Sequence, residues 1–325
     1  MSKPLVIVTD SPFPDLDPAR EILSEIDAQL KPLPESTPEA IAQASRKADA
    51  VLVTYAKIDE AVIRQMERCR IISRFGIGVD NVDISAATSA GIVVTRVPDY
   101  CLEEVADHTF ALLLALARKV PFANSLVQAG RWEMSATTPI HRLRGSTLGL
   151  LGFGRIPQLV APRGKAFGMH VIASDPYLSR ERKAQTGVEF VPFDDLLRRS
   201  DFLSIHSPLV PETLRLFNAE TFRKMKPDAC LINTARGAIV DDQALAEALD
   251  CGVIAGAALD VLPDEPPTNS PILGRNNVIV TPHMSFYSVE SLIELQKRAA
   301  QEVVRVIRGE RPLNPVNAEA LQHRG

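Results

Sequence analysis

The chain has 325 residues, of which 46% are hydrophobic and 23% are charged, proportions that are ordinary for a globular protein. A chain of this length favours two domains over one. The formal net charge is -4, and acidic and basic residues are interleaved along the chain. We therefore expect no nucleic-acid partner, because such a partner calls for a basic face. We also expect no membrane segment, since the longest apolar run, Phe110 to Ala117, is shorter than the roughly 20 residues that span a bilayer.

The first residues and the cysteines point to a cytoplasmic protein. The opening segment MSKPLVIVTD lacks the charged region, apolar core and cleavage site of a signal peptide. The cysteines are far apart and show no Cys-x-x-Cys spacing. We therefore expect reduced thiols, no disulfide and no metal site. The four cysteines are Cys69, Cys101, Cys230 and Cys251.

Short apolar strands alternate with helical patterns along the chain. The first helix is predicted to open at Asp17 and Pro18, with Asp17 as the N-cap and proline at the first helical position. Because the strands are continuously apolar, they predict parallel sheets that are covered on both faces, in doubly wound α/β domains. The expected strands are Leu5–Val8, Val51–Thr54, Ile71–Arg74, Ile92–Val94, Thr147–Leu151, Val171–Ala173, Phe202–Ile205, Cys230–Ile232, Ala255–Leu259 and Val278–Val280.

Two long helical stretches, Leu102–Arg118 and Val289–Ile307, flank the second series of strands. This arrangement fits one α/β domain inserted within another. We expect the inserted domain over residues 102–284, and a discontinuous outer domain formed by residues 1–101 and 285–325.

A glycine-rich turn, Gly152-Phe153-Gly154-Arg155-Ile156, follows the predicted strand Thr147–Leu151. The first glycine suits the tight turn of a dinucleotide-binding fingerprint, and the second lets the backbone approach a pyrophosphate. A helix start after them would offer N–H groups and a positive dipole end to the anion. Asp175, at the end of the next strand, can bind both ribose hydroxyls and would repel a 2′-phosphate. The pattern favours NAD over NADP, the alternative being that Asp175 only caps the turn before Pro176.

Two prolines interrupt the helical pattern that follows this turn. Pro157 occupies the position of the fingerprint's third glycine, and Pro162 would remove an interior hydrogen bond, at a cost of roughly 3 kcal/mol in a regular helix. We therefore predict a kinked or late-starting helix that aims fewer N–H groups at the phosphates and binds the cofactor less tightly.

Three polar residues follow consecutive strand ends in the second half. Arg236 follows Cys230–Ile232, Glu265 lies beyond the strand ending at Leu259, and His283 follows the last strand. Open α/β sheets place their ligands at such carboxyl ends. Arginine suits a carboxylate through two parallel hydrogen bonds, and histidine beside a carboxylate suits proton transfer near neutral pH. Taken singly, each could be a surface ion-pair partner, a loop charge or a satisfied histidine. Together they indicate a catalytic site.

Over nearly its whole length the chain resembles the D-isomer-specific 2-hydroxyacid dehydrogenase family. The resemblance implies a Rossmann-type nucleotide domain inserted into a smaller flavodoxin-like catalytic domain, and a homodimer built through the nucleotide domain. The motifs that carry it are Phe75-Gly76-Ile77-Gly78-Val79-Asp80-Asn81-Val82-Asp83, Leu148-Gly149-Leu150-Leu151-Gly152-Phe153-Gly154-Arg155-Ile156, Asn233-Thr234-Ala235-Arg236-Gly237, Ala257-Ala258-Leu259-Asp260-Val261 and Thr281-Pro282-His283.

The resemblance also implies individual roles. Arg236 would bind the substrate carboxylate and carbonyl oxygen, His283 would exchange the proton with the oxo or hydroxyl group, and Glu265 would stabilise the protonated imidazole. Backbone N–H groups around Ile77 and Gly78 would cradle the carboxylate. The cofactor contacts implied are the turn residues Gly152, Phe153, Gly154, Arg155 and Ile156, Asp175 on the ribose, Thr109 near the nicotinamide, Ser207, Pro208 and Thr213 near the adenosine, Thr234 and Ala235, and Asp260 by the carboxamide. For Thr109, Ser207-Pro208, Thr213 and Asp260, helix-face or capping roles are the alternative.

The segment Met284-Ser285-Phe286-Tyr287-Ser288 is similar to the branch of this family related to the C-terminal binding protein corepressors. There an aromatic residue borders the substrate pocket, so Phe286 and Tyr55 would favour an apolar side chain on a 2-oxo acid. The alternative is that Phe286 packs the following helix. We expect an NAD-dependent oxidoreductase for small 2-hydroxy or 2-oxo acids, with an NAD(H)-sensing, corepressor-like protein as the alternative. Intact Arg236, Glu265 and His283 favour the enzyme.

Overall fold

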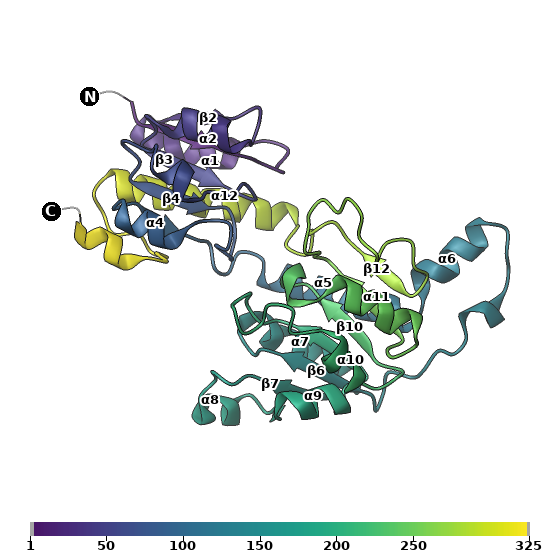
Figure 1. The fold of residues 1–325 in the computed structure, drawn as a ribbon. Helices are drawn as coiled ribbons and strands as arrows, with labels where there is room; N and C mark the ends of the chain where they lie inside the picture. Colours follow the sequence, from purple (N-terminus) through teal and green to yellow (C-terminus); the bar gives the residue numbers. More distant parts are fainter. Residues whose placement is uncertain (1–2, 324–325) are drawn as a thin grey trace. The chain divides into compact units, whose positions relative to one another are not determined.

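The computed structural model describes residues 3–323 and divides into two compact units (Figure 1). Unit 1 comprises Met1–Tyr100 and Ser288–Gly325, and unit 2 comprises Cys101–Tyr287. These divisions lie within three residues of those expected from the sequence.

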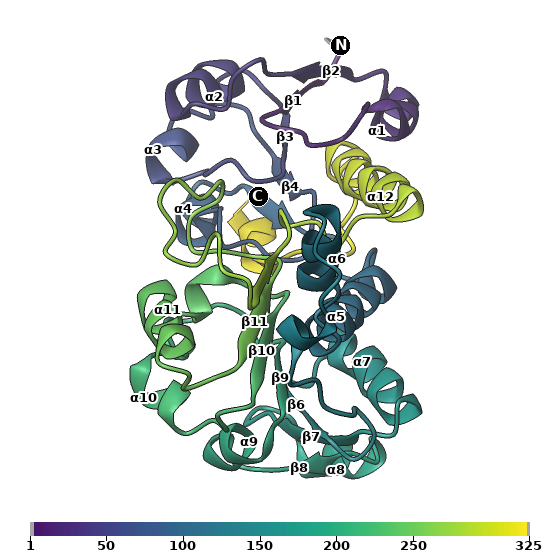
Figure 2. The same cartoon turned by 90° about the vertical axis from the view of Figure 1, so that its right-hand side faces the viewer.

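Unit 1 is built on a five-stranded parallel sheet with strand order β2-β1-β3-β4-β5, the flavodoxin-like order. Figure 2 shows α2, α3 and α4 on one side of this sheet and α1 and α12 on the other. The elements of the unit are β1 (Leu5–Val8), α1 (Asp17–Leu23), η1 (Ser24–Ile26), β2 (Gln29–Pro32), α2 (Pro38–Ser45), β3 (Ala50–Val53), α3 (Glu60–Ile63), β4 (Ile71–Arg74), α4 (Ile84–Ser89), β5 (Val93–Thr95), α12 (Val289–Ile307) and η4 (Ala318–His323).

The C-terminal segment completes unit 1 through hydrogen bonds to the sheet. Ser73 on β4 donates its hydroxyl hydrogen bond to the Ala299 carbonyl on α12 at 3.0 Å. Asn317 accepts the backbone N–H of Val94 on β5 at 2.7 Å and is fully buried. The first and last parts of the chain are therefore joined in one unit.

Unit 2 is built on a seven-stranded parallel sheet with strand order β12-β11-β10-β9-β6-β7-β8, a Rossmann-type arrangement. Its elements are α5 (Leu102–Ala117), α6 (Val120–Gln128), η2 (Met134–Thr137), β6 (Thr147–Leu151), α7 (Arg155–Ala166), β7 (His170–Ser174), α8 (Arg180–Gln185), β8 (Glu189–Phe190), α9 (Phe193–Arg199), β9 (Phe202–Ile205), α10 (Ala219–Arg223), β10 (Cys230–Asn233), η3 (Gly237–Ile239), α11 (Asp242–Asp250), β11 (Gly256–Leu259) and β12 (Val278–Val280).

Each face of the unit 2 sheet carries its own buried core. On one face α5 and α7 pack on the sheet, with Phe110 and Val160 among the buried side chains. On the other face α9, α10 and α11 cover it, with Leu197, Phe222 and Leu245 buried (Figure 2). Burial on both faces explains why these strands are continuously apolar in the sequence.

Four elements depart from the sequence prediction. The edge strands β2 and β8 were not predicted because only Leu30 among their residues is buried. Helix α6 follows the predicted helical stretch Leu102–Arg118 and was not predicted; Lys119, with φ of 51°, separates it from α5. The prediction that Asp17 caps α1 is wrong. Leu16 is the N-cap, Asp17 is the first helical residue, and its N–H is accepted by the Asp15 carboxylate at 3.0 Å.

The sequence predicted a kinked or late-starting helix after the glycine-rich turn, and the late start is wrong. Helix α7 begins at Arg155, directly after Gly154, and runs unbroken to Ala166 through Pro162. Pro157 lies in the first turn, where helical N–H groups have no intrahelical partner in any case. Gly164 allows the close packing that the fingerprint's third glycine usually provides, since a Cβ there would lie 2.8 Å from Leu148 Cδ2 on β6.

Within the described residues, no single helix has the length and apolarity needed to cross a membrane. The bent pair α5 and α6, with 58° between them, meets the same test by length and composition only.

Candidate functional site

The glycine-rich turn at the end of β6 has the geometry of a phosphate cradle. Gly152 has φ of 85°, and a Cβ there would lie 2.9 Å from the His206 carbonyl oxygen, so the turn requires glycine. A Cβ at Gly154 would meet nothing within 4 Å, so open space lies above the start of α7, which no side chain caps. Beside the turn, Ser207 carries a buried hydroxyl with no partner among the described residues. An open cradle and an unpartnered hydroxyl fit a dinucleotide.

Asp175 connects the turn to the end of β7. One carboxylate oxygen accepts the Phe153 N–H at 2.8 Å, and the other accepts the N–H groups of Tyr177 and Leu178 at 2.9 and 3.1 Å. The residue thus caps the turn before Pro176, as the alternative interpretation had it, and its contact with a ribose stays a prediction. Phe153 takes part through its backbone, since its ring is buried against Phe190.

His206 follows β9 beside the same turn. Its Nε2 lies 2.9 Å from the Ser204 hydroxyl. Burial lowers the pKa of His206 to about 3, so the ring is neutral at physiological pH. Next to it, the Thr213 hydroxyl donates to the Pro208 carbonyl at 2.7 Å and accepts the Val210 N–H. Thr213 therefore shapes the loop that carries Pro208, and its contact with the adenosine stays a prediction.

Arg236 lies in a loop that begins where β10 ends. The Asn233 side chain fixes the backbone of this loop by accepting the Ala235 N–H at 3.0 Å and donating to the Arg236 carbonyl at 2.9 Å. Gly237 brings the loop against the segment after β11, because a Cβ there would lie 1.9 Å from the Leu262 carbonyl carbon. Arg236 and the Leu262–Glu265 segment are therefore neighbouring parts of one edge of the sheet.

Glu265 and His283 lie in direct hydrogen-bonding contact, the pairing of a histidine with a carboxylate that the sequence pattern predicted. Glu265 Oε2 lies 2.6 Å from His283 Nδ1, while Oε1 accepts the Leu262 N–H at 2.9 Å. Both side chains remain partly accessible, 33% for Glu265 and 24% for His283. A carboxylate held this way can stabilise an imidazolium and fix the orientation of the ring.

His283 has a left-handed backbone, with φ of 50°. The buried Asp260 holds the residues around it, since its carbonyl accepts the His283 N–H at 2.8 Å and its carboxylate accepts the N–H groups of Met284 and Ser285. The Phe286 ring lies edge-on to the imidazole, with 6.3 Å between the ring centroids. The contact of Asp260 with the nicotinamide carboxamide stays a prediction. The hydrogen bonds in the structure give Asp260 a structural role, because they hold the backbone at residues 283–285.

Thr109 and Thr234 join α5 to the end of β10 through a hydrogen bond of 2.9 Å between their hydroxyl groups. Both residues are buried. Two further polar residues of unit 2, His108 and Thr281, contact Asp260 and were not singled out in the sequence. Thr281 lies two residues before His283 in the motif Thr281-Pro282-His283, and this position is the sequence signal that could have identified it.

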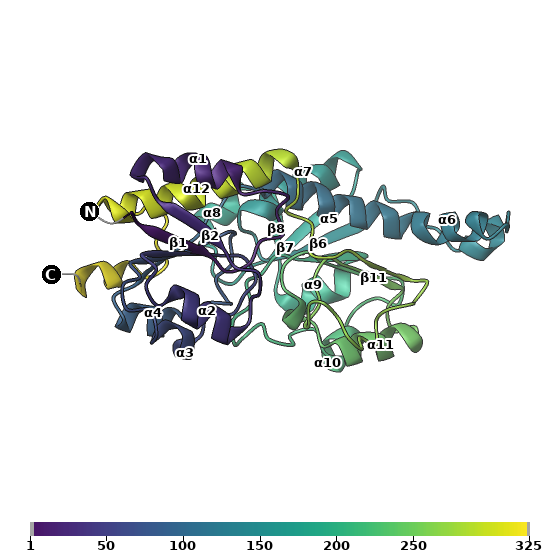
Figure 3. The same cartoon turned by 90° about the horizontal axis from the view of Figure 1, so that it is seen from above.

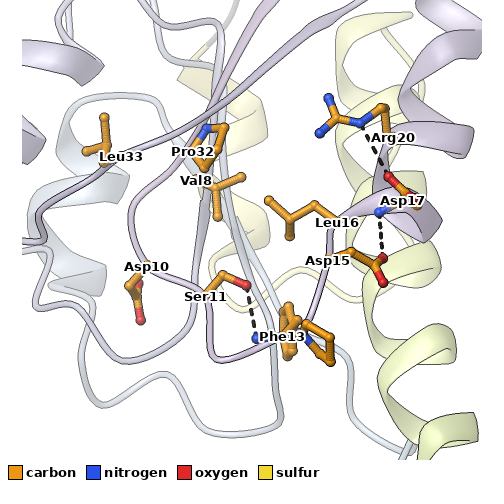
Figure 4. Close-up of a pocket in the computed structure, with 11 residues that line it drawn as sticks. Val8, Asp10, Ser11, Phe13, Asp15, Leu16, Asp17, Arg20, Pro32 and Leu33 are labelled. Atoms are coloured by element: carbon orange, nitrogen blue, oxygen red, sulfur yellow. Dashed lines mark hydrogen bonds and ion pairs between the residues drawn. The ribbon is translucent and has the colours of Figure 1, made fainter.

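The remaining predicted residues lie in unit 1. Ile77 and Gly78 follow β4, and Tyr55 is exposed after β3, with its N–H bound to the Asp10 carboxylate at 2.6 Å. A cavity of about 360 Å³ between the end of β1 and α1, drawn in Figure 4, contains none of these three. The roles predicted for them stay predictions. Among the described residues, no group of three histidine, cysteine, aspartate or glutamate side chains is placed to hold a metal ion.

The fold and these motifs define a class of protein. A model of the NAD-binding domain of D-isomer-specific 2-hydroxyacid dehydrogenases matches residues 110–285. The chain belongs to this family, and residues 110–285 are its NAD-binding domain.

The chain is similar to several dehydrogenases and reductases. The chain is 39% identical to the D-3-phosphoglycerate dehydrogenase of Methanocaldococcus jannaschii, over 96% of this chain and 59% of that protein. It is 40% identical to the glyoxylate reductase of Thermococcus litoralis, over 85% and 86% of the two chains. The crystal structure of Aquifex aeolicus D-lactate dehydrogenase, complexed with NAD and lactic acid, matches with a TM-score of 0.87 and 30% identity over 96% and 99% of the chains. The chain spans only 49–59% of the length of the first phosphoglycerate dehydrogenases it matches.

Proposed function

We propose that this protein catalyses the reversible, NAD-dependent reduction of a small 2-oxo acid to the D-2-hydroxy acid. The observation that carries the proposal is the 2.6 Å contact between His283 Nδ1 and Glu265 Oε2 at the carboxyl edge of an NAD-binding sheet. A protein that only senses NAD(H) has no need for such an acid–base pair, and the dehydrogenase and reductase activities of the relatives do not favour that alternative.

Proton transfer is assigned to His283. Because Glu265 occupies Nδ1, the proton that reaches the substrate oxygen leaves from Nε2. When bound, NADH supplies the hydride that adds to the substrate's C2. In reduction, Nε2–H protonates the oxygen at C2 and the imidazole becomes neutral. In oxidation, neutral Nε2 takes the hydroxyl proton.

Arg236 is assigned to the substrate carboxylate. A guanidinium can bind a carboxylate through two parallel hydrogen bonds, which orients the substrate as well as holding it. The Asn233 contacts that fix the Arg236 loop support this role, since a positioned loop loses less entropy on binding.

The cofactor site supports NAD rather than NADP. The Asp175 carboxylate places a negative charge at the end of β7, where a 2′-phosphate would be repelled. We assign the pyrophosphate to the start of α7 at Gly154, Arg155 and Ile156, where Pro157 contributes no N–H.

Phe286 is assigned to the substrate side chain. Its ring lies close to the His283 imidazole and is partly exposed, so it would favour apolar groups on C3 of the 2-oxo acid. The relatives act on substrates of several kinds, and the substrate remains a small 2-oxo acid of unspecified side chain.

The decisive experiment follows NADH absorbance while a panel of 2-oxo acids is added to the purified protein. The panel runs from glyoxylate and pyruvate through longer apolar 2-oxo acids to phosphohydroxypyruvate. Turnover of at least one member supports the proposal. Tight NADH binding without turnover of any member would favour a sensing protein instead.

A homodimer through unit 2 is proposed from the surface around α6. Figures 1 and 3 show α6 extending from the end of α5, away from the rest of unit 2. On α6, Val120 and Val127 are exposed, and just after the helix Trp132 and Met134 are 88% and 83% exposed. Next to it lies a cavity of about 1040 Å³, lined by parts of α5, α6 and residues 139–146. Exposed apolar side chains beside a large cavity support burial against a second copy.

The dimer is tested by light scattering after size-exclusion chromatography. Trp132→Asp places a charge in the proposed interface and should shift the mass from dimer to monomer. Tyr177→Asp, at an exposed aromatic residue elsewhere in unit 2, is the control. A monomeric wild-type protein would contradict this part of the proposal. We also propose a cytoplasmic location, where the four cysteines would remain thiols.

A further inference from the structure

A chain of three polar side chains in unit 2 ends on the residue that holds the His283 loop. His108 Nε2, on α5, lies 3.0 Å from the Thr281 hydroxyl, which donates to Asp260 Oδ1 at 2.6 Å. His108 Nε2 itself is 3.6 Å from the same carboxylate oxygen. The Asp260 side chain is completely buried, and the His108 side chain is 19% exposed.

The direction of these hydrogen bonds follows from the chemistry of the groups. The Thr281 hydroxyl carries one proton, and it donates this proton to Asp260 Oδ1. The hydroxyl oxygen must then accept from His108, whose Nε2 therefore carries a hydrogen. His108 fixes the rotamer in which Thr281 donates to Asp260.

Asp260 in turn determines the backbone at His283. Its carboxylate accepts the N–H groups of Met284 at 2.9 Å and Ser285 at 2.8 Å, and its carbonyl accepts the N–H of His283 at 2.8 Å. A non-glycine residue in the left-handed region, as His283 is, is strained and persists only where its surroundings determine it. Asp260 supplies these surroundings, because its oxygens accept the N–H groups of the histidine and of the two residues after it.

We propose that His108 and Thr281 are positioning residues for the acid–base histidine, acting through Asp260. Without the Thr281 hydroxyl, Asp260 loses a donor in a buried place and the loop is held by fewer bonds, so the imidazole spends less time aligned with Glu265 and the substrate oxygen. The inference rests on the proposed function for its effect on rate, but the geometry concerns unit 2 alone.

Matched variants separate the hydroxyl from the packing at Thr281. Thr281→Val removes the hydroxyl at nearly constant shape, and Thr281→Ser keeps it. We expect Thr281→Val to lower kcat for 2-oxo acid reduction about 10- to 100-fold, with NADH affinity within about twofold of wild type. Thr281→Ser should stay within about threefold of wild type. At His108, Leu should lower kcat and Gln should restore it, because the Gln side-chain amide can donate to Thr281.

A spectroscopic measurement decides the inference without turnover. In protein labelled with 15N-histidine, the Nδ1 proton shared by His283 and Glu265 should give a downfield signal that is absent in His283→Ala. We expect this signal to disappear or broaden in Thr281→Val and to persist in Thr281→Ser. Equal signals and equal kcat in wild type, Thr281→Val and His108→Leu would overturn the inference, as would equal losses in Thr281→Val and Thr281→Ser. A wild type without turnover would contradict the proposed function, while the signal would still test the positioning.

Discussion

Glu265 is bound at both of its carboxylate oxygens, with Oε2 lying 2.6 Å from His283 Nδ1 and Oε1 accepting the Leu262 N–H at 2.9 Å. The backbone contact fixes the carboxylate, and the carboxylate fixes the imidazole. The charge that stabilises the imidazolium is therefore placed before any substrate binds, which is the arrangement that proton transfer requires.

Glu265→Gln should lower kcat for reduction at neutral pH by about 10- to 100-fold. The amide keeps the shape of the carboxylate but loses the charge that stabilises protonated His283. Steady-state kinetics of 2-oxo acid reduction at neutral pH measure this. An unchanged kcat would show that Glu265 acts only on the backbone of Leu262.

Two glycines of the turn should respond differently to alanine. Gly154→Ala adds a methyl group to open space, so the thermal midpoint should hardly change while NADH binding weakens, because the methyl group occupies the approach of the pyrophosphate. Gly152→Ala should destabilise unit 2 by about 1–3 kcal/mol, because of the positive φ and the approach to the His206 carbonyl. Thermal unfolding and NADH titration of both variants check this. If Gly154→Ala binds NADH as strongly as the wild type does, the assignment of the pyrophosphate to the start of α7 is wrong.

Asp175→Asn should shift the cofactor preference toward NADPH. Removal of the charge removes the repulsion of a 2′-phosphate, while the amide oxygen can still accept N–H groups at the end of β7. The ratio of kcat/KM for NADPH to that for NADH should rise about tenfold or more, equivalent to about 1.4 kcal/mol. An unchanged ratio would show that Asp175 only caps the turn before Pro176 and does not select between the two cofactors.

His206 should make unit 2 less stable in acid. Burial lowers its pKa from 6.5 in the unfolded chain to about 3 in the folded protein. Between these values the unfolded chain binds more protons, so stability falls as the pH drops through this window. His206 keeps some accessible surface, so we predict the direction of this change in stability and not its size. Urea midpoints at pH 7 and pH 5 should differ more for the wild type than for His206→Gln, and equal differences would contradict it.

The strand pattern predicted most of the fold because both sheets are parallel and buried on both faces. The edge strands β2 and β8 were not predicted, because their exposed residues form no continuous apolar run. The start of α7 was mispredicted because Pro157 and Pro162 were taken to disfavour a regular helix directly after the turn. Pro157 lies in the first turn, and this position removes its cost, since no intrahelical bond is lost there.

Arg236, Glu265 and His283 were predictable because each side chain follows a strand end, and adjacent parallel strands bring their ends to one edge. His108 was not predictable in the same way. It lies on α5, far from Thr281 in the sequence, and only the packing of α5 on the sheet brings the two together. Contacts of this kind carry no local signal in a single sequence.

The most direct test of the account is the rate of NADH oxidation by His283→Ala compared with the wild type, using the best 2-oxo acid of the panel. The account predicts that the variant binds NADH as the wild type does but turns over about 10²- to 10⁴-fold more slowly, because the proton donor is gone. A variant that oxidises NADH at the wild-type rate would show that another group supplies the proton and would contradict the central claim.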